Sequence, residues 1–193
     1  GGEFNVGIGN ATLDALTSAD KCVAIGYEAG SAINSGGANT LVGHEAGKVI
    51  TTGTFNTFVG FEAGNNFDTE SNNVGFGSAA LGGPIAGGSS NVALGSSTLA
   101  SLTSADFNIA IGNEAGSGIT TSNDNIAIGR NCMTGTLTGN GSNCFVGSSI
   151  GTQLTSGFYN QAIGSSALGN LISGISNIAI GHDSGLTTTT GDH

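Results

Sequence analysis

The sequence contains very few cationic residues. Lys and Arg together number 3 of 193 residues, against 13 Asp and Glu, so the formal net charge is −10. A chain so short of cations cannot neutralise phosphate groups, which disfavours nucleic acids and anionic membranes as partners. No apolar run approaches the roughly 20 residues that a membrane-spanning helix requires. We therefore expect no nucleic-acid partner and no membrane insertion.

Proline and cysteine are also scarce. A single proline beside 36 glycines excludes a proline-rich tract, and the glycines lack the three-residue period of collagen. The three cysteines are too few, and odd in number, for a disulfide framework. Cys132 and Cys144 fall within one repeat, so a bond between them stays open, although burial as small apolar side chains is the simpler interpretation.

A five-residue phrase, Asn-x-Ala-Ile-Gly in its commonest form, recurs along the whole chain. Successive phrases are 17 or 18 residues apart, and so regular a period is typical of a solenoid in which each repeat stacks on its neighbours. We call the last residue of each phrase the anchor glycine and number each repeat from it. The anchor glycines are Gly9, Gly26, Gly43, Gly60, Gly77, Gly95, Gly112, Gly129, Gly147, Gly164 and Gly181.

Each repeat has the same pattern of residue types. Position −1 is always apolar, position +3 is mostly small, position +4 is Gly, Leu or Met, and position +7 is mostly large and apolar. The segment from −4 to −1 is short, rich in β-branched residues and ends at Gly, which predicts a strand, and the polar stretch after +7 predicts turns. We therefore expect an all-β parallel β-solenoid of about eleven 17-residue coils, forming a single domain over residues 1–193.

Two steps of 18 residues interrupt the period. They place one extra residue near Pro84–Ser89 and one near Thr134–Gly141. Both segments are polar loops, where one more residue costs little free energy.

Position −4 is Asn in every repeat but one, in which Cys22 takes its place. Identical amides stacked coil on coil can each donate to one neighbour and accept from the other. The pattern therefore predicts a structural ladder, although exposed turn-forming asparagines are the alternative. The predicted ladder is Asn39, Asn56, Asn73, Asn91, Asn108, Asn125, Asn143, Asn160 and Asn177.

The predicted strand is apolar on both faces, because position −2 is never polar and position −1 is always apolar. A strand of this kind is buried on both sides. Position −2 varies from Gly to Phe, which we interpret as an interface with another copy, and we assign position −1 to the solenoid interior. The polar Gln161 at position −3 fits this assignment poorly. The predicted oligomer interface is Leu41, Phe58, Ala93, Ala110, Ala127, Phe145, Ala162 and Ala179.

Few residues are candidates for chemistry. Glu28, Glu45 and Glu62 share position +2 of successive coils and form a row of oxygen ligands suited to Ca²⁺, but a solvated acidic edge is the simpler interpretation. The run 182–184 contains the residue types of a catalytic triad, yet consecutive side chains point apart. We expect no metal, no cofactor and no catalytic residue, and hence no enzyme.

The repeats also carry hydroxyl side chains at positions +8 and +9, such as Thr103 and Ser104. A flat, regular row of threonines is one way in which a solenoid can order water and bind ice. A soluble turn is the simpler interpretation, because Asn34 and Asp68 interrupt the row.

The phrase Asn-x-Ala-Ile-Gly with a small residue at +3 resembles the head repeats of trimeric autotransporter adhesins. The stretch Asn56–Gly64 also resembles the shaft repeats of phage and giant-virus tail fibres. This resemblance covers the whole chain and implies a homotrimer on a virion or outside the cell that serves attachment to a cell-surface receptor or glycan. The 17-residue period and the lack of an adhesin neck motif favour the fibre over the adhesin.

We therefore expect a structural, non-enzymatic fibre shaft or head. The chain begins and ends in mid-repeat, which favours a fragment of a longer fibre. The alternative is a subunit of an extracellular filament that assembles end to end, because uncapped parallel coils can stack without limit. An ice-binding solenoid is the third interpretation.

Overall fold

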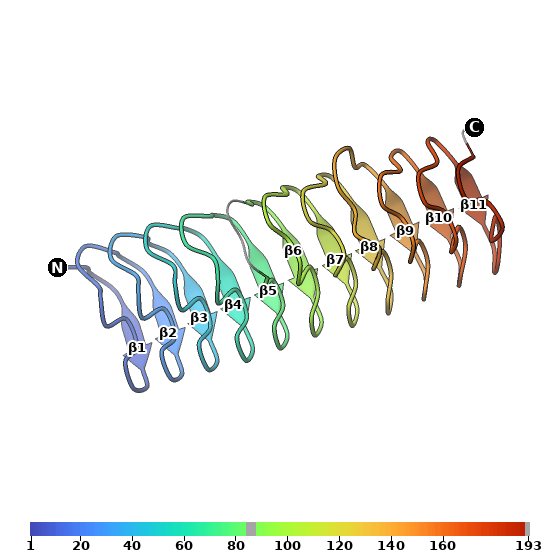
Figure 1. The fold of residues 1–193 in the computed structure, drawn as a ribbon. Helices are drawn as coiled ribbons and strands as arrows, with labels where there is room; N and C mark the ends of the chain where they lie inside the picture. The colour runs from blue at the N-terminus through green and yellow to red at the C-terminus, as the bar shows by residue number, and fades with distance from the viewer. Residues whose placement is uncertain (84–87, 192–193) are drawn as a thin grey trace.

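The computed structural model describes residues 1–83 and 88–191 and shows a β-solenoid (Figure 1). Each of eleven coils contributes one three-residue strand, and the described residues contain no helix. The strands are β1 (Val6–Ile8), β2 (Val23–Ile25), β3 (Thr40–Val42), β4 (Thr57–Val59), β5 (Val74–Phe76), β6 (Val92–Leu94), β7 (Ile109–Ile111), β8 (Ile126–Ile128), β9 (Cys144–Val146), β10 (Gln161–Ile163) and β11 (Ile178–Ile180).

The strands form one parallel sheet in chain order, so every coil pairs only with the coils before and after it. The pairing is in register with the repeat: Val23 lies opposite Thr40, and Ile25 lies opposite Val42. At the end of the strand the Gly43 N–H donates to the Ile25 carbonyl at 2.8 Å. The predicted all-β parallel solenoid is confirmed, with each strand at positions −3 to −1.

The anchor glycine is required by its backbone geometry. Its φ is between 122° and 155° in all eleven coils, a region that residues with a side chain rarely adopt. A Cβ on Gly43 would also lie 2.1 Å from the Gly60 carbonyl oxygen of the next coil. The anchor glycines thus pack backbone against backbone, which explains why the phrase always ends in Gly.

The solenoid interior is lined by positions −2, +3, +4 and +7, which form one buried apolar cluster. Side chains at −2 and +4 share the same space. Where position −2 is large, position +4 is glycine: a Cβ on Gly64 would lie 2.3 Å from the Phe58 ring, and one on Gly151 would lie 2.1 Å from the Phe145 ring. Where position −2 is Gly75 or Ala93, position +4 is leucine. Ala24 with Gly30 and Ala110 with Gly116 are small at both positions, and there leucines of adjacent coils fill the space: a Cβ on Gly30 would lie 2.8 Å from Leu41, and one on Gly116 would lie 2.8 Å from Leu99.

The assignment of the two strand faces from the sequence is therefore wrong. Position −2 faces the interior of the same chain, and positions −1 and −3 face outward. Variation at −2 reflects exchange of volume with +4 rather than contact with another copy. The predicted interface residues are at most 4% exposed within the single chain: Leu41, Phe58, Ala93, Ala110, Ala127, Phe145, Ala162 and Ala179. Gln161, which fitted the first assignment poorly, lies on the exposed face.

The asparagine ladder is present at one corner of the interior. From Asn39 to Asn160, each amide oxygen accepts the backbone N–H of the next ladder asparagine at 2.9–3.2 Å. From Asn73 to Asn177 the amides are also bonded to one another, each Nδ2 donating to the preceding Oδ1. All nine residues are buried, so the alternative of exposed turn formers is wrong. Cys22 interrupts the ladder, and its thiol lies 3.4 Å from the Gly36 carbonyl oxygen.

The second of the two inserted residues shifts the interior position of its coil. Thr136 stands at +7 but is not buried, and Leu137 is buried in its place. The extra residue therefore precedes Leu137, within the predicted loop. The first predicted insertion, near Pro84–Ser89, falls largely on residues 84–87, which lie outside the described residues.

Candidate functional site

The outward strand face is an apolar feature that runs along all eleven strands of the described surface. It comprises positions −3 and −1 of the strands, and we call it the outer strand face. Phe76 is 57% exposed and Ile111 is 37% exposed on it. No strand carries a charged residue at either position; its polar members are Thr40, Thr57 and Gln161. Because consecutive strands are paired in register, these side chains form an uninterrupted stripe along the rod.

Aromatic side chains flank parts of this face on each side. At position +1, the His44 ring stacks between those of Tyr27 and Phe61, with centroid distances of 5.1 Å to each. At position −5, Phe55 and Phe107 are 64% and 60% exposed. The stacked imidazole shows that equivalent side chains of successive coils come into direct contact.

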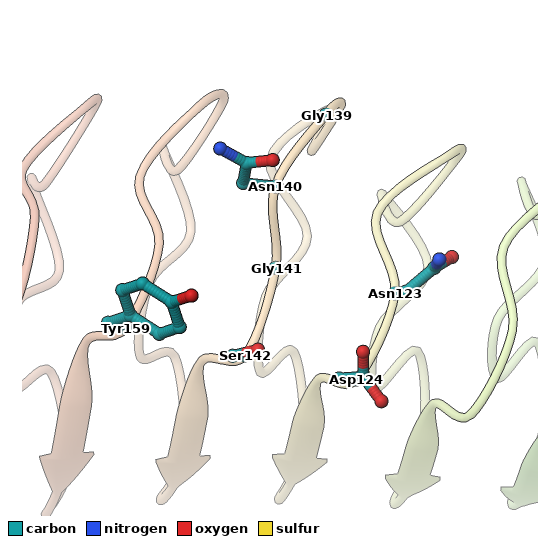
Figure 2. Close-up of a pocket in the computed structure, with 7 residues that line it drawn as sticks. All are labelled: Asn123, Asp124, Gly139, Asn140, Gly141, Ser142 and Tyr159. Atoms are coloured by element: carbon teal, nitrogen blue, oxygen red, sulfur yellow. The ribbon is translucent and has the colours of Figure 1, made fainter.

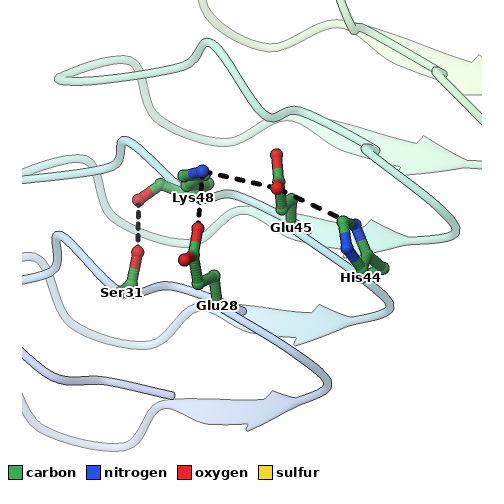
Figure 3. A network of polar contacts seen from close by, with 5 residues as sticks. All are labelled: Glu28, Ser31, His44, Glu45 and Lys48. Carbon is green, nitrogen blue, oxygen red and sulfur yellow. Dashed lines mark hydrogen bonds and ion pairs between the residues drawn. The ribbon is translucent and has the colours of Figure 1, made fainter. Parts of the chain in front are cut away.

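The row of carboxylates at position +2 does not form an open cation site. The Lys48 ammonium lies 2.5 Å from Glu28 and 3.4 Å from Glu45, between two of the three predicted oxygen ligands (Figure 3). Hydrogen bonding to Lys48 is the largest cause that lowers the pKa of Glu28, and the same bond raises the pKa of Lys48. Because Lys48 already supplies the positive charge, the row is better explained as a surface ion-pair network.

The third carboxylate belongs to a different group. His44, Glu45 and Glu62 each offer one ligand atom, and these atoms lie within 4.8 Å of one another. The cluster is open to solvent, and Glu45 is shared with Lys48. The triad-like run near the C-terminus is also exposed: His182 Nδ1 lies 3.1 Å from Asp183, but among the described residues no hydrogen bond joins Ser184 to the imidazole.

The cysteines lie on different sides of the coil wall. Cys22 and Cys132 are fully buried in the interior, whereas Cys144 stands at position −3 of β9, on the outer strand face. Burial raises the pKa of Cys22, and it raises that of Cys132 to about 12. All three thiols are free, and the wall of the coil separates Cys132 from Cys144.

The threonine hydroxyls at position +8 are engaged in the stacking of coils. Thr17, Thr103 and Thr155 each donate to a backbone carbonyl of the following coil at 2.8–3.1 Å. These bonds explain the hydroxyl-rich stretch as support for the turn. The exposed Ile172 further interrupts the row.

A polar hollow lies beside the starts of β8, β9 and β10 (Figure 2). It has a volume of about 290 Å³ and is lined by Asn123, Asp124, Gly139, Asn140, Gly141, Ser142 and Tyr159. Sequence reasoning did not predict it. The signal in the sequence is Asn140, which stands where most other coils bury Gly, Ala or Ser.

Comparison of the chain with protein-family models, with curated proteins and with solved structures gives no match. Among the described residues, no helix is long and apolar enough to cross a membrane.

Proposed function

We propose that this chain is a structural, non-enzymatic rod, the shaft or head of an attachment fibre, which associates as a homotrimer through the outer strand face. The observation that carries the proposal is the apolar stripe on eleven consecutive parallel strands. Parallel sheets occur almost only with both faces covered. Here the chain buries one face of the sheet in its own interior and leaves the other face, which is also apolar, uncovered.

The dimensions of the stripe show that residues beside it must also contribute to an interface. Three residues along each strand and eleven strands across the sheet give roughly 10 Å by 50 Å, or about 500 Å². A stable interface buries about 800 Å² per partner, so the stripe alone is small for a dimer. In a threefold arrangement, three stripes meet around an axis and the aromatic border at position +1 of each chain packs against a neighbouring stripe, so position −5 stays exposed.

The side chains on the stripe favour a parallel, in-register assembly. The stripe changes from coil to coil, for example from Val59 to Phe76 to Leu94. When the rotation axis runs along the rod, each residue packs against the same residue of the other chains. The side chains of every layer therefore match in size. The amides of Gln161 would likewise meet one another and pair, which satisfies this polar group inside the interface.

The interior explains how such a rod resists bending. The asparagine ladder and the strand pairs tie each coil to the next, and the polar amides are satisfied at every coil. Stiffness and repetition suit a part that presents a distant tip or a multivalent surface, on a virion or outside a cell. The filament alternative would use the same interior, but no specific observation favours it.

Cys144 provides a native probe of the proposed interface. It lies on the outer strand face, whereas Cys22 and Cys132 are fully buried. In the assembled rod we expect all three thiols to be protected from dithiobis-nitrobenzoate, and an Ile111→Asp variant to expose one thiol. The matched control is Ile172→Asp, which adds the same charge at an exposed apolar residue outside the stripe. Fast reaction of one thiol in the unmodified chain would contradict the proposal.

A further inference from the structure

We propose that the polar hollow at Asp124, Ser142 and Tyr159 is a binding subsite for a neutral glycan. This inference rests on the attachment role proposed above and gives it a ligand class. The hollow combines an exposed aromatic ring with amide, carboxylate and hydroxyl groups around a volume of about 290 Å³. Neutral sugars present apolar C–H faces and hydroxyl groups, which these two kinds of surface complement.

The hollow exists because the inserted coil departs from the repeat. Asn140 is exposed, whereas Ser122 and Gly157 at the equivalent position are buried. Gly141 then approaches the preceding coil so closely that a Cβ would lie 1.7 Å from the Asn123 carbonyl oxygen. The floor is fixed by backbone hydrogen bonds: the Ser142 N–H donates to Asn123 at 3.1 Å, and the Tyr159 N–H donates to Gly141 at 3.2 Å.

Three side chains of different chemistry line one edge of the hollow. Asp124, Ser142 and Tyr159 all stand at position −5, in three successive coils, with Asn123 and Asn140 above them in Figure 2. At about 4.8 Å per coil the row is roughly 10 Å long, enough for one or two sugar rings. Tyr159 is 59% exposed, and its ring is held by an edge contact with Phe158 at 5.2 Å.

The polar atoms of this row are available to a ligand. Among the described residues, the side chains of Asp124, Asn140, Ser142 and Tyr159 make no hydrogen bond. Asn123 uses its amide oxygen to accept the Asp106 N–H at 2.9 Å, which leaves its Nδ2 as a donor. The lining therefore offers acceptors and donors to sugar hydroxyls.

The charge of the hollow selects against acidic sugars. Asp124 is its one ionisable carboxylate, and no Lys, Arg or His is among the described residues that line it. A sialylated or sulfated glycan would bring a negative charge beside this carboxylate on a chain of net charge −10. Direct Ca²⁺ binding is also disfavoured, since that ion takes six to eight oxygen ligands and prefers several carboxylates.

The test is a glycan array probed with the fluorescently labelled chain, on which neutral, sialylated and sulfated oligosaccharides are compared. We expect retention on neutral glycans that survives EDTA. Tyr159→Ser should weaken binding at least about tenfold, the loss of one stacking contact of about 1.4 kcal/mol. This variant keeps a residue type that other coils carry at the same position, such as Ser90 and Ser176. Phe107→Ser is the matched control, because it removes an exposed aromatic at position −5 outside the hollow.

Several results would overturn the subsite: no retention on neutral glycans, retention on acidic glycans alone, loss of binding in EDTA, or equal loss in the Tyr159→Ser and Phe107→Ser variants. The mass of the same sample in solution separates this inference from the proposed function. If the chain is a trimer but retains no neutral glycan, the proposed function stands and the glycan subsite is refuted. If the chain is a monomer that binds neutral glycans through Tyr159, the subsite stands and the proposed homotrimer is refuted.

Discussion

At the scale of single residues, the interior is filled by pairs of positions. Position −2 of the strand and position +4 of the following turn share one volume, so Phe58 is matched by Gly64 and Gly75 by Leu81. Both +4 backbones are left-handed, with φ of 58° at Gly64 and 54° at Leu81, so leucine and glycine adopt the same turn. Side-chain volume rather than backbone conformation therefore decides which residue stands there.

This pairing predicts a compensating double variant. Phe58→Ala leaves a cavity and should lower the free energy of unfolding by about 3–5 kcal/mol. Gly64→Leu alone should also be destabilising, since the added side chain would overlap the Phe58 ring. The combined variant reproduces the Ala93–Leu99 arrangement and should recover at least about 2 kcal/mol of the summed loss. Urea unfolding at one protein concentration measures the cycle, and simple additivity would refute the exchange of volume.

Cys22 is the one break in the asparagine row, and its repair should stabilise the chain. Cys22→Asn places an amide between Asn5 and Asn39, where it can accept the Asn39 N–H and donate to the Gly36 carbonyl. We expect the free energy of unfolding to rise by about 1 kcal/mol, the net value of a typical hydrogen bond. The control, Cys22→Ala, should lower it. A lower free energy of unfolding for Cys22→Asn would contradict the prediction that the missing amide weakens this coil.

The buried thiol of Cys132 predicts a loss of stability in alkali. Burial raises its pKa to about 12 in the folded chain, against 9.0 for a free thiol. Between these values the unfolded chain loses the proton and the folded chain keeps it, so stability falls as the pH rises from 9 to 12. Cys132→Ala, which carries the commonest residue at position +3, should show a shallower decline in melting temperature over this range. Parallel curves for the two chains would contradict the assignment.

At the scale of the repeated element, the anchor glycines act as a backbone ladder. Gly43→Ala would force a side chain into a φ of 141° and against the Gly60 carbonyl oxygen. We expect a loss of about 4 kcal/mol or more, or failure to fold. Gly7→Ala is the control, because its Cβ would meet its nearest neighbour at 3.6 Å, and it should change stability by less than about 0.5 kcal/mol. Thermal melts of the two variants check both statements.

The repeat predicted the strand and its pairing but not which face is inside. The 17-residue period and the β-branched phrase were sufficient for the parallel sheet, because equivalent residues of successive coils must stack. Both strand faces are apolar, however, so burial could not be read from polarity. The deciding signals were Gln161 at position −3 and the match between Phe58 and Gly64. The 18-residue step near Thr134–Gly141 and the polar Asn140 mark the coil that forms the hollow, but the length of a step does not show where the loop goes, so the hollow was not predicted.

At the scale of the whole molecule, the chain is a rod whose sheet has one face buried in its own interior and one face exposed. The interior satisfies its own amides and fills its own volume, so it requires no partner. The outer strand face does not: its stripe, mostly Val, Ile, Leu and Phe, runs along all eleven strands. Exposed apolar surface of this extent marks an interaction site in soluble proteins. The proposed homotrimer covers it.

The mass of the chain in solution, measured by light scattering during size exclusion, tests this account most directly. We expect three chain masses for the unmodified protein and for Ile172→Asp, and one chain mass for Ile111→Asp, whose charge lies in the middle of the stripe. Circular dichroism should show that all three remain folded, since residue 111 points away from the interior. A single-chain mass for the unmodified protein, over a range of concentrations, would contradict the assembly through the outer strand face.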